Sequence, residues 1–261
     1  MNNDLADFLT KLNALRSQTA HDCAEHAIGA YYSYLEGIGI EHCNFGGFKI
    51  TADGIPSINQ FSGTRLSDHF IEEFSEELAG DDYVLRRAQD LSAERPIAKF
   101  ETGLPVLDEI EAFHAPARNV QIECARQGIE EGVALLGNTS LGATGTGDRG
   151  GRYFGFVFGG ERGTRALLSQ HGQAVEIASF ALLDRIMPQV EARIDGVEAN
   201  LSVRERDVLA ALARGAMRKQ IAFDFNIALP TVDMYIAAIK RKLDAGTLPE
   251  AVAKGYRYGL L

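Results

Sequence analysis

The residues with the clearest chemical potential lie in the stretch FIEEFSEELAGDDYV, at positions 70–84. Phe70 and Phe74 are four positions apart, so on a helix their rings would share one face. A run of acidic residues follows, and then Asp82, whose carboxylate can accept hydrogen bonds. Two hypotheses result. The stretch is either the wall of a small-molecule pocket anchored by Asp82, or an acidic helix that buries two rings, with Asp82 at a helix N-terminus.

Other patterns in the chain predict neither a catalytic nor a metal site. His21, Cys23 and His26 lie close together, but H-x-C-x-x-H is not a usual zinc spacing. No G-x-S-x-G, H-E-x-x-H or Walker pattern occurs. The Gly-rich stretch at 138–151 lacks a Lys-Ser/Thr pair and precedes a strand, which favours a hairpin connection over a phosphate loop. We therefore expect no enzyme activity, no metal and no cofactor.

The formal net charge of the 261-residue chain is −10, but this charge is unevenly distributed. Residues 201–261 hold ten Lys and Arg against six Asp and Glu, whereas residues 1–200 hold 16 against 30. A basic end on an acidic body predicts that only the end meets a polyanion. Three widely spaced Cys favour free thiols. With no apolar run near the ~20 residues that span a bilayer, we expect a cytoplasmic protein that does not enter membranes.

The elements that must position these residues follow from hydrophobic periodicity. Helices are expected over 4–35, 66–78, 81–91, 107–115, 117–128 and 161–194, with Ser67 capping the second and Pro188 kinking or ending the last. Strands are expected over 43–51, 132–137 and 152–160. Strands flanked by helices on both sides predict an α/β domain, a three-layer α-β-α sandwich, over residues 1–190. Residues 191–200 are the expected linker to an all-α domain at 201–261.

This C-terminal domain has strong local signals. Ser202 followed by Glu205 predicts a capping box that starts the first helix. A short helix at 217–225, a turn at 226–228 and a helix at 229–243 capped by Thr231 form a helix-turn-helix layout, and a fourth helix is expected at 248–261. The pattern resembles the LuxR-type (GerE-like) DNA-binding domain. The matching residues are Leu201, Arg204, Glu205, Val208, Leu209, Gly215, Lys219, Ile221, Ala222, Thr231, Val232, Ile239, Lys242 and Leu243.

The resemblance implies double-stranded DNA as a partner. Phosphate contacts are expected from cations at the start of the second helix and late in the third, namely Arg218, Lys219, Lys240, Arg241 and Lys242. The first turns of the third helix should meet base edges through Thr231, Val232, Asp233, Met234 and Tyr235. Asp233 departs from the family, which often has a basic residue there, and Asn226 replaces the usual turn glycine. A weakly basic recognition helix predicts a homodimer, with the apolar face of 161–190 as its seam.

Residues 5–190 are similar in layout to the autoinducer-binding domain of quorum-sensing regulators, through Asp82-Tyr83-Val84 and Gly128-Ile129-Glu130-Glu131-Gly132-Val133. The resemblance implies a pocket for an acyl-homoserine lactone in which the Asp accepts from the amide. In the family, Trp and Tyr donate to the carbonyls and a second Trp packs over the lactone. Here these positions fall near Phe70, Phe74 and Ile97, none of which can donate a hydrogen bond.

Three outcomes fit this altered pocket. The small-molecule signal is a different, more apolar or aromatic compound. Or it is a homoserine lactone that binds through other donors, with Tyr31, Tyr32, Tyr34 and Tyr83 as candidates. Or the rings fill the pocket and no ligand is needed. The chain is thus expected to be a transcriptional regulator under ligand control or constitutively active. The alternative is a ligand-independent regulator that acts by protein contact, through dimerisation or sequestration of a partner.

Overall fold

The structure, a computed structural model, consists of two compact units. It describes residues 3–15, 20–50, 56–58, 66, 70, 72, 74–91, 95–138, 152–195, 197 and 200–261. The first unit comprises Met1–Gln18 and Glu25–Arg185, and the second comprises Thr19–Ala24 and Ile186–Leu261. Each unit has a hydrophobic core of its own.

A five-stranded sheet with the order β2-β1-β5-β4-β3 forms the centre of the first unit. Its strands are β1 (His42–Ile50), β2 (Pro56–Ile58), β3 (Ile97–Gly103), β4 (Glu131–Asn138) and β5 (Arg152–Gly160). All neighbouring strands are antiparallel. The register of β4 and β5 runs from Glu131 opposite Gly160 to Asn138 opposite Tyr153. This pairing confirms the hairpin predicted for 138–151, although residues 139–151 themselves lie outside the described part.

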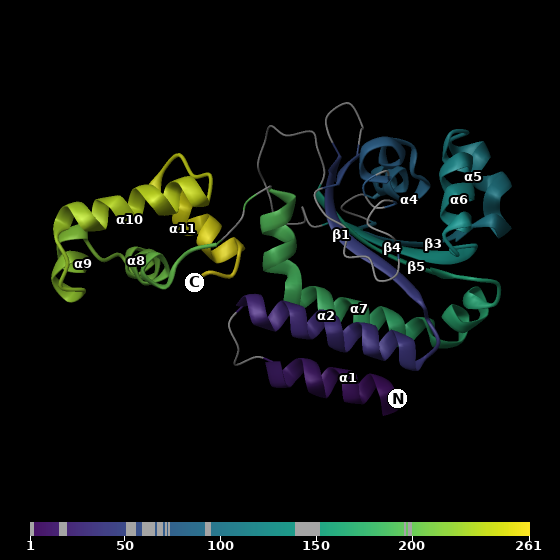
Figure 1. Ribbon diagram of the computed structural model, residues 1–261, viewed down its shortest axis with the longest axis horizontal. Coiled ribbons are helices and arrows are strands. Elements are labelled where there is room, and N and C mark those ends of the chain that lie inside the picture. Colours follow the sequence, from purple (N-terminus) through teal and green to yellow (C-terminus); the bar gives the residue numbers. More distant parts are fainter. Residues whose placement is uncertain are drawn as a thin grey trace. The chain divides into compact units, whose positions relative to one another are not determined.

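Helices cover both faces of the sheet (Figure 1). One face carries α1 (Asn3–Ala14), α2 (Ala20–Gly37) and the first-unit part of α7 (Thr164–Ile194). The other carries α4 (Tyr83–Arg87), α5 (Leu107–Phe113) and α6 (Ala117–Arg126). Tyr31 packs between the helices and the sheet on the α1–α2–α7 face. Its ring lies edge-on to Phe45 and Phe156, and its hydroxyl is hydrogen-bonded to Ser179 at 2.6 Å. The predicted three-layer α-β-α arrangement is confirmed.

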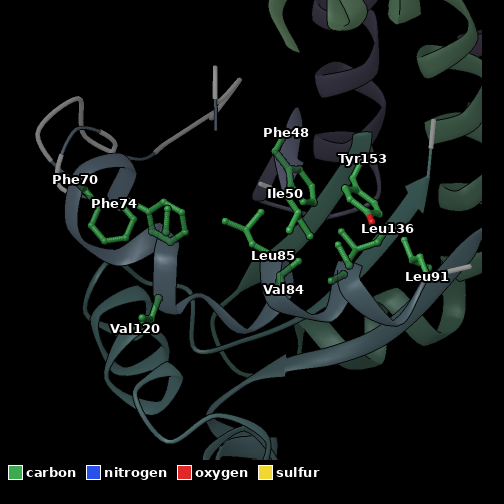
Figure 2. Close-up of a cluster of buried hydrophobic side chains, with 13 residues drawn as sticks. Phe48, Ile50, Phe70, Phe74, Val84, Leu85, Leu91, Val120, Leu136 and Tyr153 are labelled. Atoms are coloured by element: carbon green, nitrogen blue, oxygen red, sulfur yellow. The ribbon is translucent and has the colours of Figure 1, made fainter. Parts of the chain in front are cut away.

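The opposite face of the sheet carries a second apolar core (Figure 2). Phe48 of β1 and Tyr153 of β5 stack there with ring centroids 5.5 Å apart. Val84 and Leu85 of α4 pack onto this face, and Figure 2 shows Phe70 and Phe74 side by side beyond Leu85. The two predicted candidate rings therefore belong to the layer that covers the sheet on this side.

The segment that crosses this face is built from short helical pieces. A π-helix at Phe74–Leu78 and a 3₁₀ turn at Ala79–Asp81 precede α4, and a second 3₁₀ turn at Ala88–Asp90 follows it. A third 3₁₀ turn, Leu104–Val106, precedes α5. The regular helix predicted for 66–78 is thus replaced by a π turn in its described C-terminal part. Its predicted cap, Ser67, lies outside the described residues.

Gly103 ends β3 in a conformation that requires glycine. Its φ of 92° is left-handed, and a Cβ at this position would collide with the Glu130 carbonyl oxygen. The same residue ties β3 to α6, because its N–H donates to Gln121 Oε1 at 2.9 Å. This bond holds Gln121, which is buried, against the end of the sheet.

The second unit is helical after α7. It contains α8 (Val203–Ala213), α9 (Arg218–Asp224), α10 (Leu229–Lys242) and α11 (Leu248–Arg257). The predicted capping box is confirmed, with Ser202 N–H donating to Glu205 Oε2 at 2.6 Å. Asn226 has a φ of 51°, so it tolerates the left-handed angle of the turn as predicted. Ala228 is the N-cap of α10, which places Thr231 inside the helix and corrects its predicted role as a cap.

The bend between α9 and α10 is 112°. Helices of a helix-turn-helix cross at about 90–120°, so this bend fits the predicted motif. Among the described helices, no single one is long and apolar enough to cross a membrane, and α9 with α10 meets that measure only as this bent pair.

Further expectations differ from the structure. The helical stretch at 4–35 is divided into α1 and α2, and β2 and β3 were not predicted. Helix α7 continues through Pro188 to Ile194, so of the two effects predicted for this proline, a kink or the end of the helix, it does not end the helix. The apolar face expected as a dimer seam is buried within the first unit itself, at Leu168, Val175, Ala178 and Leu182. These side chains are part of the chain's own core, so this face is not available as a seam between two copies.

Candidate functional site

A cavity lies between the sheet and the layer that contains α4 and α6. Its volume is about 80 Å³, counted as the space that the centre of a water molecule can reach. One water needs about 10–15 Å³ of such space, so the cavity has room for a small organic molecule. Its twelve described lining residues are Asn44, Leu66, Phe70, Phe74, Asp82, Val84, Leu85, Thr102, Gln121, Cys124, Ile129 and Val157.

Phe70 and Phe74 form an apolar part of the cavity wall. Their ring centroids are 6.0 Å apart at an angle of 50°, and both side chains are buried. Neither ring has a group that donates a conventional hydrogen bond. The structure thus brings together the two rings and Asp82, the three residues that the sequence singled out first.

Asp82 has two roles at once. It is the N-cap of α4, where its Oδ1 accepts from Leu85 N–H at 2.9 Å, and it lines the cavity. The helix-cap and pocket-wall hypotheses for this residue are therefore compatible. Burial raises the pKa of its carboxyl from 3.8 to about 6, although backbone hydrogen bonds from Leu85 and Val84 act in the opposite direction. At neutral pH the side chain is mainly a buried carboxylate.

Four further polar residues line the cavity and were not predicted. Asn44 of β1, Thr102 of β3 and Gln121 of α6 are all buried, and Cys124 of α6 is partly buried. Burial raises the pKa of the Cys124 thiol to about 12, so this group is neutral. The only sequence signal is that polar side chains interrupt apolar elements. That signal is weak, because a strand or helix end also explains it.

Ile97 and Tyr83 do not line the cavity, which corrects their predicted place in the pocket. Ile97 begins β3 with 49% of its surface exposed. Tyr83 is buried on another side of α4, where its ring contacts Phe100 and Phe113 edge-on. The Arg87 guanidinium lies 5.1–5.7 Å from these three ring centroids. Tyr83 therefore belongs to an aromatic cluster around an arginine.

The tyrosines of α2 that were considered as replacement donors also lie away from the cavity. Tyr31, Tyr32 and Tyr34 are absent from the described lining. Tyr31 is already hydrogen-bonded to Ser179, and Tyr32 donates to the Cys43 carbonyl at 3.3 Å. Of the described lining residues, Thr102, Gln121 and Asn44 carry conventional donor groups.

The helix-turn-helix surface contains the residues that the sequence predicted to meet DNA. Arg218, Lys219, Asp233 and Arg241 are exposed, whereas Thr231, Tyr235, Lys240 and Lys242 are partly exposed. Val232 has no exposed surface and packs in the core of the second unit. A fully buried side chain cannot touch DNA, so the structure makes Val232 a core residue and corrects that prediction.

Two of the predicted phosphate-binding cations have carboxylate partners. Arg218 Nη1 lies 3.0 Å from Asp233 Oδ1, which joins the start of α9 to the first turns of α10. Lys242 Nζ lies 2.7 Å from Oε2 of Glu205, a buried carboxylate. Burial would raise the pKa of Glu205, but hydrogen bonds from Lys242 and Ser202 outweigh it and lower this pKa. Lys242, at the end of α10, therefore neutralises the carboxylate of the α8 capping box.

Lys219, Lys240 and Arg241 remain without an ion-pair partner in the described part of the chain. Met234, which lies in α10 together with Lys240 and Arg241, has 59% of its surface exposed. The arrangement offers three unpaired cations and a mixed polar and apolar first turn of α10. No three His, Cys, Asp or Glu residues of the described segments lie close enough to hold a metal ion.

Comparison with known proteins gives matches for both units. Residues 199–254 match the family of bacterial regulatory proteins, luxR family. The transcriptional regulatory protein FixJ of Azorhizobium caulinodans is 46% identical over 54 residues, which cover 21% of this chain and 26% of FixJ. The curated relatives of this kind are matched over only about a quarter to two fifths of their length.

Two solved structures are similar over more of the chain. One is CepR2 from Burkholderia cenocepacia, an N-acylhomoserine lactone dependent LuxR family transcription factor. The match has 17% sequence identity and a TM-score of 0.50, and it covers 72% of this chain and 98% of CepR2. The other is Escherichia coli SdiA, with 15% identity, a TM-score of 0.42, and coverage of 98% and 97%. At this identity the likeness to CepR2 concerns the fold.

Proposed function

We propose that this chain, whose residues 199–254 match the family of bacterial regulatory proteins, luxR family, is a transcription regulator that binds double-stranded DNA. The observation that carries the proposal is the bent pair of α9 and α10, with α10 as the helix that enters the major groove. Lys219, Lys240 and Arg241 are the proposed phosphate contacts. Because DNA is the partner, the proposed place of action is the cytoplasm.

Base edges are proposed to be met by the first turns of α10. Thr231 and Tyr235 are partly exposed there, and Asp233 is exposed. The ion pair of Asp233 with Arg218 offsets a charge that would otherwise repel phosphate, and a carboxylate can accept from the cytosine amino group. This set offers few contacts for one domain. We therefore propose that the protein binds DNA as a homodimer.

The salt dependence of DNA affinity tests this proposal. Each neutralised phosphate contributes about −0.9 to the slope of log K against log salt concentration. Three unpaired cations per domain thus give a slope of about −3 for one domain and about −5 for a pair. The measurement is fluorescence anisotropy with DNA from upstream of the protein's own gene, between about 50 and 200 mM salt. A slope near −3 with a monomeric mass would contradict the dimer, and equal affinity for unrelated DNA would contradict a regulator of specific genes.

We propose further that a small molecule in the cavity of the first unit controls DNA binding. Support comes from a cavity with an apolar wall and a few convergent polar groups, which is the usual character of ligand sites. An acyl-homoserine lactone and another apolar or aromatic compound are both candidates. CepR2 depends on N-acylhomoserine lactones, but Phe70 and Phe74 cannot donate to the carbonyls of such a ligand.

Native mass spectrometry of the purified protein tests ligand control. We expect a bound mass that disappears in Asp82→Ala and persists in Tyr31→Phe, because Tyr31 lies on the opposite face of the sheet. The released compound should change DNA affinity when it is added back. If the purified protein carries no compound and a cell extract leaves its DNA affinity unchanged, control through protein contact replaces this proposal.

A further inference from the structure

The side-chain amide of Gln121 is bonded at its oxygen and free at its nitrogen. Its Oε1 accepts from Gly103 N–H at 2.9 Å, and the residue lines the cavity with 5% of its surface exposed. This bond fixes the orientation of the amide, because a flipped amide would direct its N–H₂ group at the backbone N–H of Gly103. Nε2 therefore carries its two hydrogens on the side of the amide that is not bonded to β3.

The Nε2 group of Gln121 is open to a ligand. It has no hydrogen-bond partner among the described residues. Unlike Asn44 Oδ1, it is not closed off by the surrounding protein, and the surface that it retains lies at the cavity. A buried N–H₂ group without a partner has given up bonds to water, so an acceptor placed in the cavity beside it is stabilised.

Thr102 supplies a second donor at the same end of the cavity. It precedes Gly103 in β3, lines the cavity and is 3% exposed. Its hydroxyl likewise has no partner among the described residues and is not closed off. Gln121 is bonded to the next residue of the strand, so an O–H and an N–H₂ group meet where α6 packs against β3. A carbonyl oxygen, with its two lone pairs, is the acceptor that two such donors suit.

We propose that Gln121 determines the ligand specificity of this cavity by donating from Nε2 to a carbonyl oxygen of the ligand. The ligand is a ketone, ester, lactone or amide whose apolar body lies along Phe70 and Phe74, and Thr102 is the second donor to its carbonyl end. The inference rests on the proposed function, since it names the group that recognises the controlling ligand. It assigns to α6 the donor role that neither phenylalanine ring can fill.

Two probes of matched size test the preference for a carbonyl. The lactone 5-butyloxolan-2-one carries a carbonyl oxygen, and 2-butyloxolane is the same skeleton with only the ring ether oxygen. Isothermal titration of the full-length protein measures both dissociation constants. We expect the lactone to bind at least about tenfold more tightly than the ether, as one hydrogen bond from a buried donor allows.

Substitutions at Gln121 separate a donor role from a structural one. Gln121→Met keeps a similar length and removes the amide, whereas ionised Gln121→Glu keeps an acceptor for Gly103 N–H but has no hydrogen to donate. In both variants the preference for the lactone should vanish. If Gln121 only tied α6 to β3, its loss would weaken both probes by the same factor and leave their ratio unchanged. Tyr31→Phe, on the opposite face of the sheet, should keep the wild-type ratio. Far-UV circular dichroism establishes that each variant is folded.

The outcomes separate this inference from the proposed function. Equal affinity of the wild type for the two probes, or binding of neither, would overturn the inference. A preference that is kept in both folded Gln121 variants and lost in Thr102→Val would also overturn it, because the hydroxyl would then be the selecting donor. Carbonyl-selective binding through Gln121 that leaves DNA affinity unchanged would support the inference and contradict ligand control. A natural ligand that controls DNA binding equally in the wild type and in Gln121→Met would support ligand control and overturn the inference.

Discussion

Replacement of Asp82 by Asn should stabilise the first unit at neutral pH and have little effect in acid. Asp82 is 5% exposed, and its Oδ1 caps α4 through Leu85 N–H. Asn is about as good an N-cap as Asp, so Asp82→Asn preserves the cap while it removes the buried charge. The change therefore isolates the cost of ionising this carboxyl inside the protein.

The magnitude follows from the raised pKa. Burial raises the pKa of Asp82 from 3.8 to about 6, and each tenfold change in proton affinity is worth about 1.4 kcal/mol. Between pH 4 and 6 the folded state binds a proton that the unfolded state has lost. This group's contribution to stability thus decreases as the pH rises through that window. The advantage of Asp82→Asn over the wild type should grow by about 2 kcal/mol from pH 4 to pH 7.5.

Pulsed hydrogen exchange in a urea series measures this difference locally. Wild type and Asp82→Asn are equilibrated in urea at each pH, and the labelling of the peptide that contains α4 reports the unfolded fraction. A carbon-13 titration of the Asp82 carboxyl gives its pKa directly. If the free-energy difference between the two proteins is the same at pH 4 and pH 7.5, or if the carboxyl titrates near 4, the description of Asp82 as a buried carboxylate is wrong.

Three predictions concern the DNA-binding unit. The double substitution Lys240→Ala with Arg241→Ala should weaken binding to DNA of any sequence. Fluorescence anisotropy should show a salt slope reduced by about 2 per domain. An unchanged slope would mean that neither residue contacts phosphate. Lys242→Met should destabilise the unit by about 1–3 kcal/mol in thermal unfolding, because it leaves the buried Glu205 carboxylate without its cation; a loss of affinity at full stability would make Lys242 a DNA contact instead. Asp233→Asn should strengthen non-specific DNA binding and steepen its salt slope by about 1, because it frees Arg218 from its ion pair. An unchanged slope would refute this prediction.

Features of the second unit that are encoded locally were predictable. Ser202 and Glu205 satisfy each other's backbone groups within one helical turn, so the capping box does not depend on distant residues. Asn226 accepts its left-handed angle for reasons that are equally local. The pairing of Lys242 with Glu205 was not predictable in this way. It spans 37 positions and depends on how α10 crosses α8.

The cavity was predictable only where its residues lie in one segment. Phe70, Phe74 and Asp82 were identified from their spacing and all line the cavity. Asn44 and Gln121 come from a distant strand and helix, and they meet the others only after the sheet has formed. No spacing within the chain brings them together, so their contribution could not be derived from sequence.

Errors in the predicted site arise from the direction in which a side chain points. Tyr83 is adjacent to Asp82, but successive residues of a helix point about 100° apart, and its ring turns away from the cavity toward Phe100. Val232 was included among the DNA contacts because it lies in the first turns of α10, whereas its side chain is on the buried side of the helix. The dimer seam predicted on the apolar face of α7 failed for a related reason. Hydrophobicity indicates that a surface is buried, but it does not indicate whether the same chain or a second copy buries it.

The nature of the lining residues distinguishes the cavity from a packing defect. A defect in a protein core is lined by hydrocarbon, which loses only dispersion contacts and burial free energy. Here Asn44, Asp82, Thr102 and Gln121 are all buried at the same cavity. Each buried polar group costs stability unless it is hydrogen-bonded, and the Asn44 acceptor has no partner among the described residues. A chain that needed only to fill this space with the rings of Phe70 and Phe74 would be more stable with an apolar residue in place of Asn44. Four buried polar side chains at one cavity favour the proposed ligand site over a core completed by its own side chains.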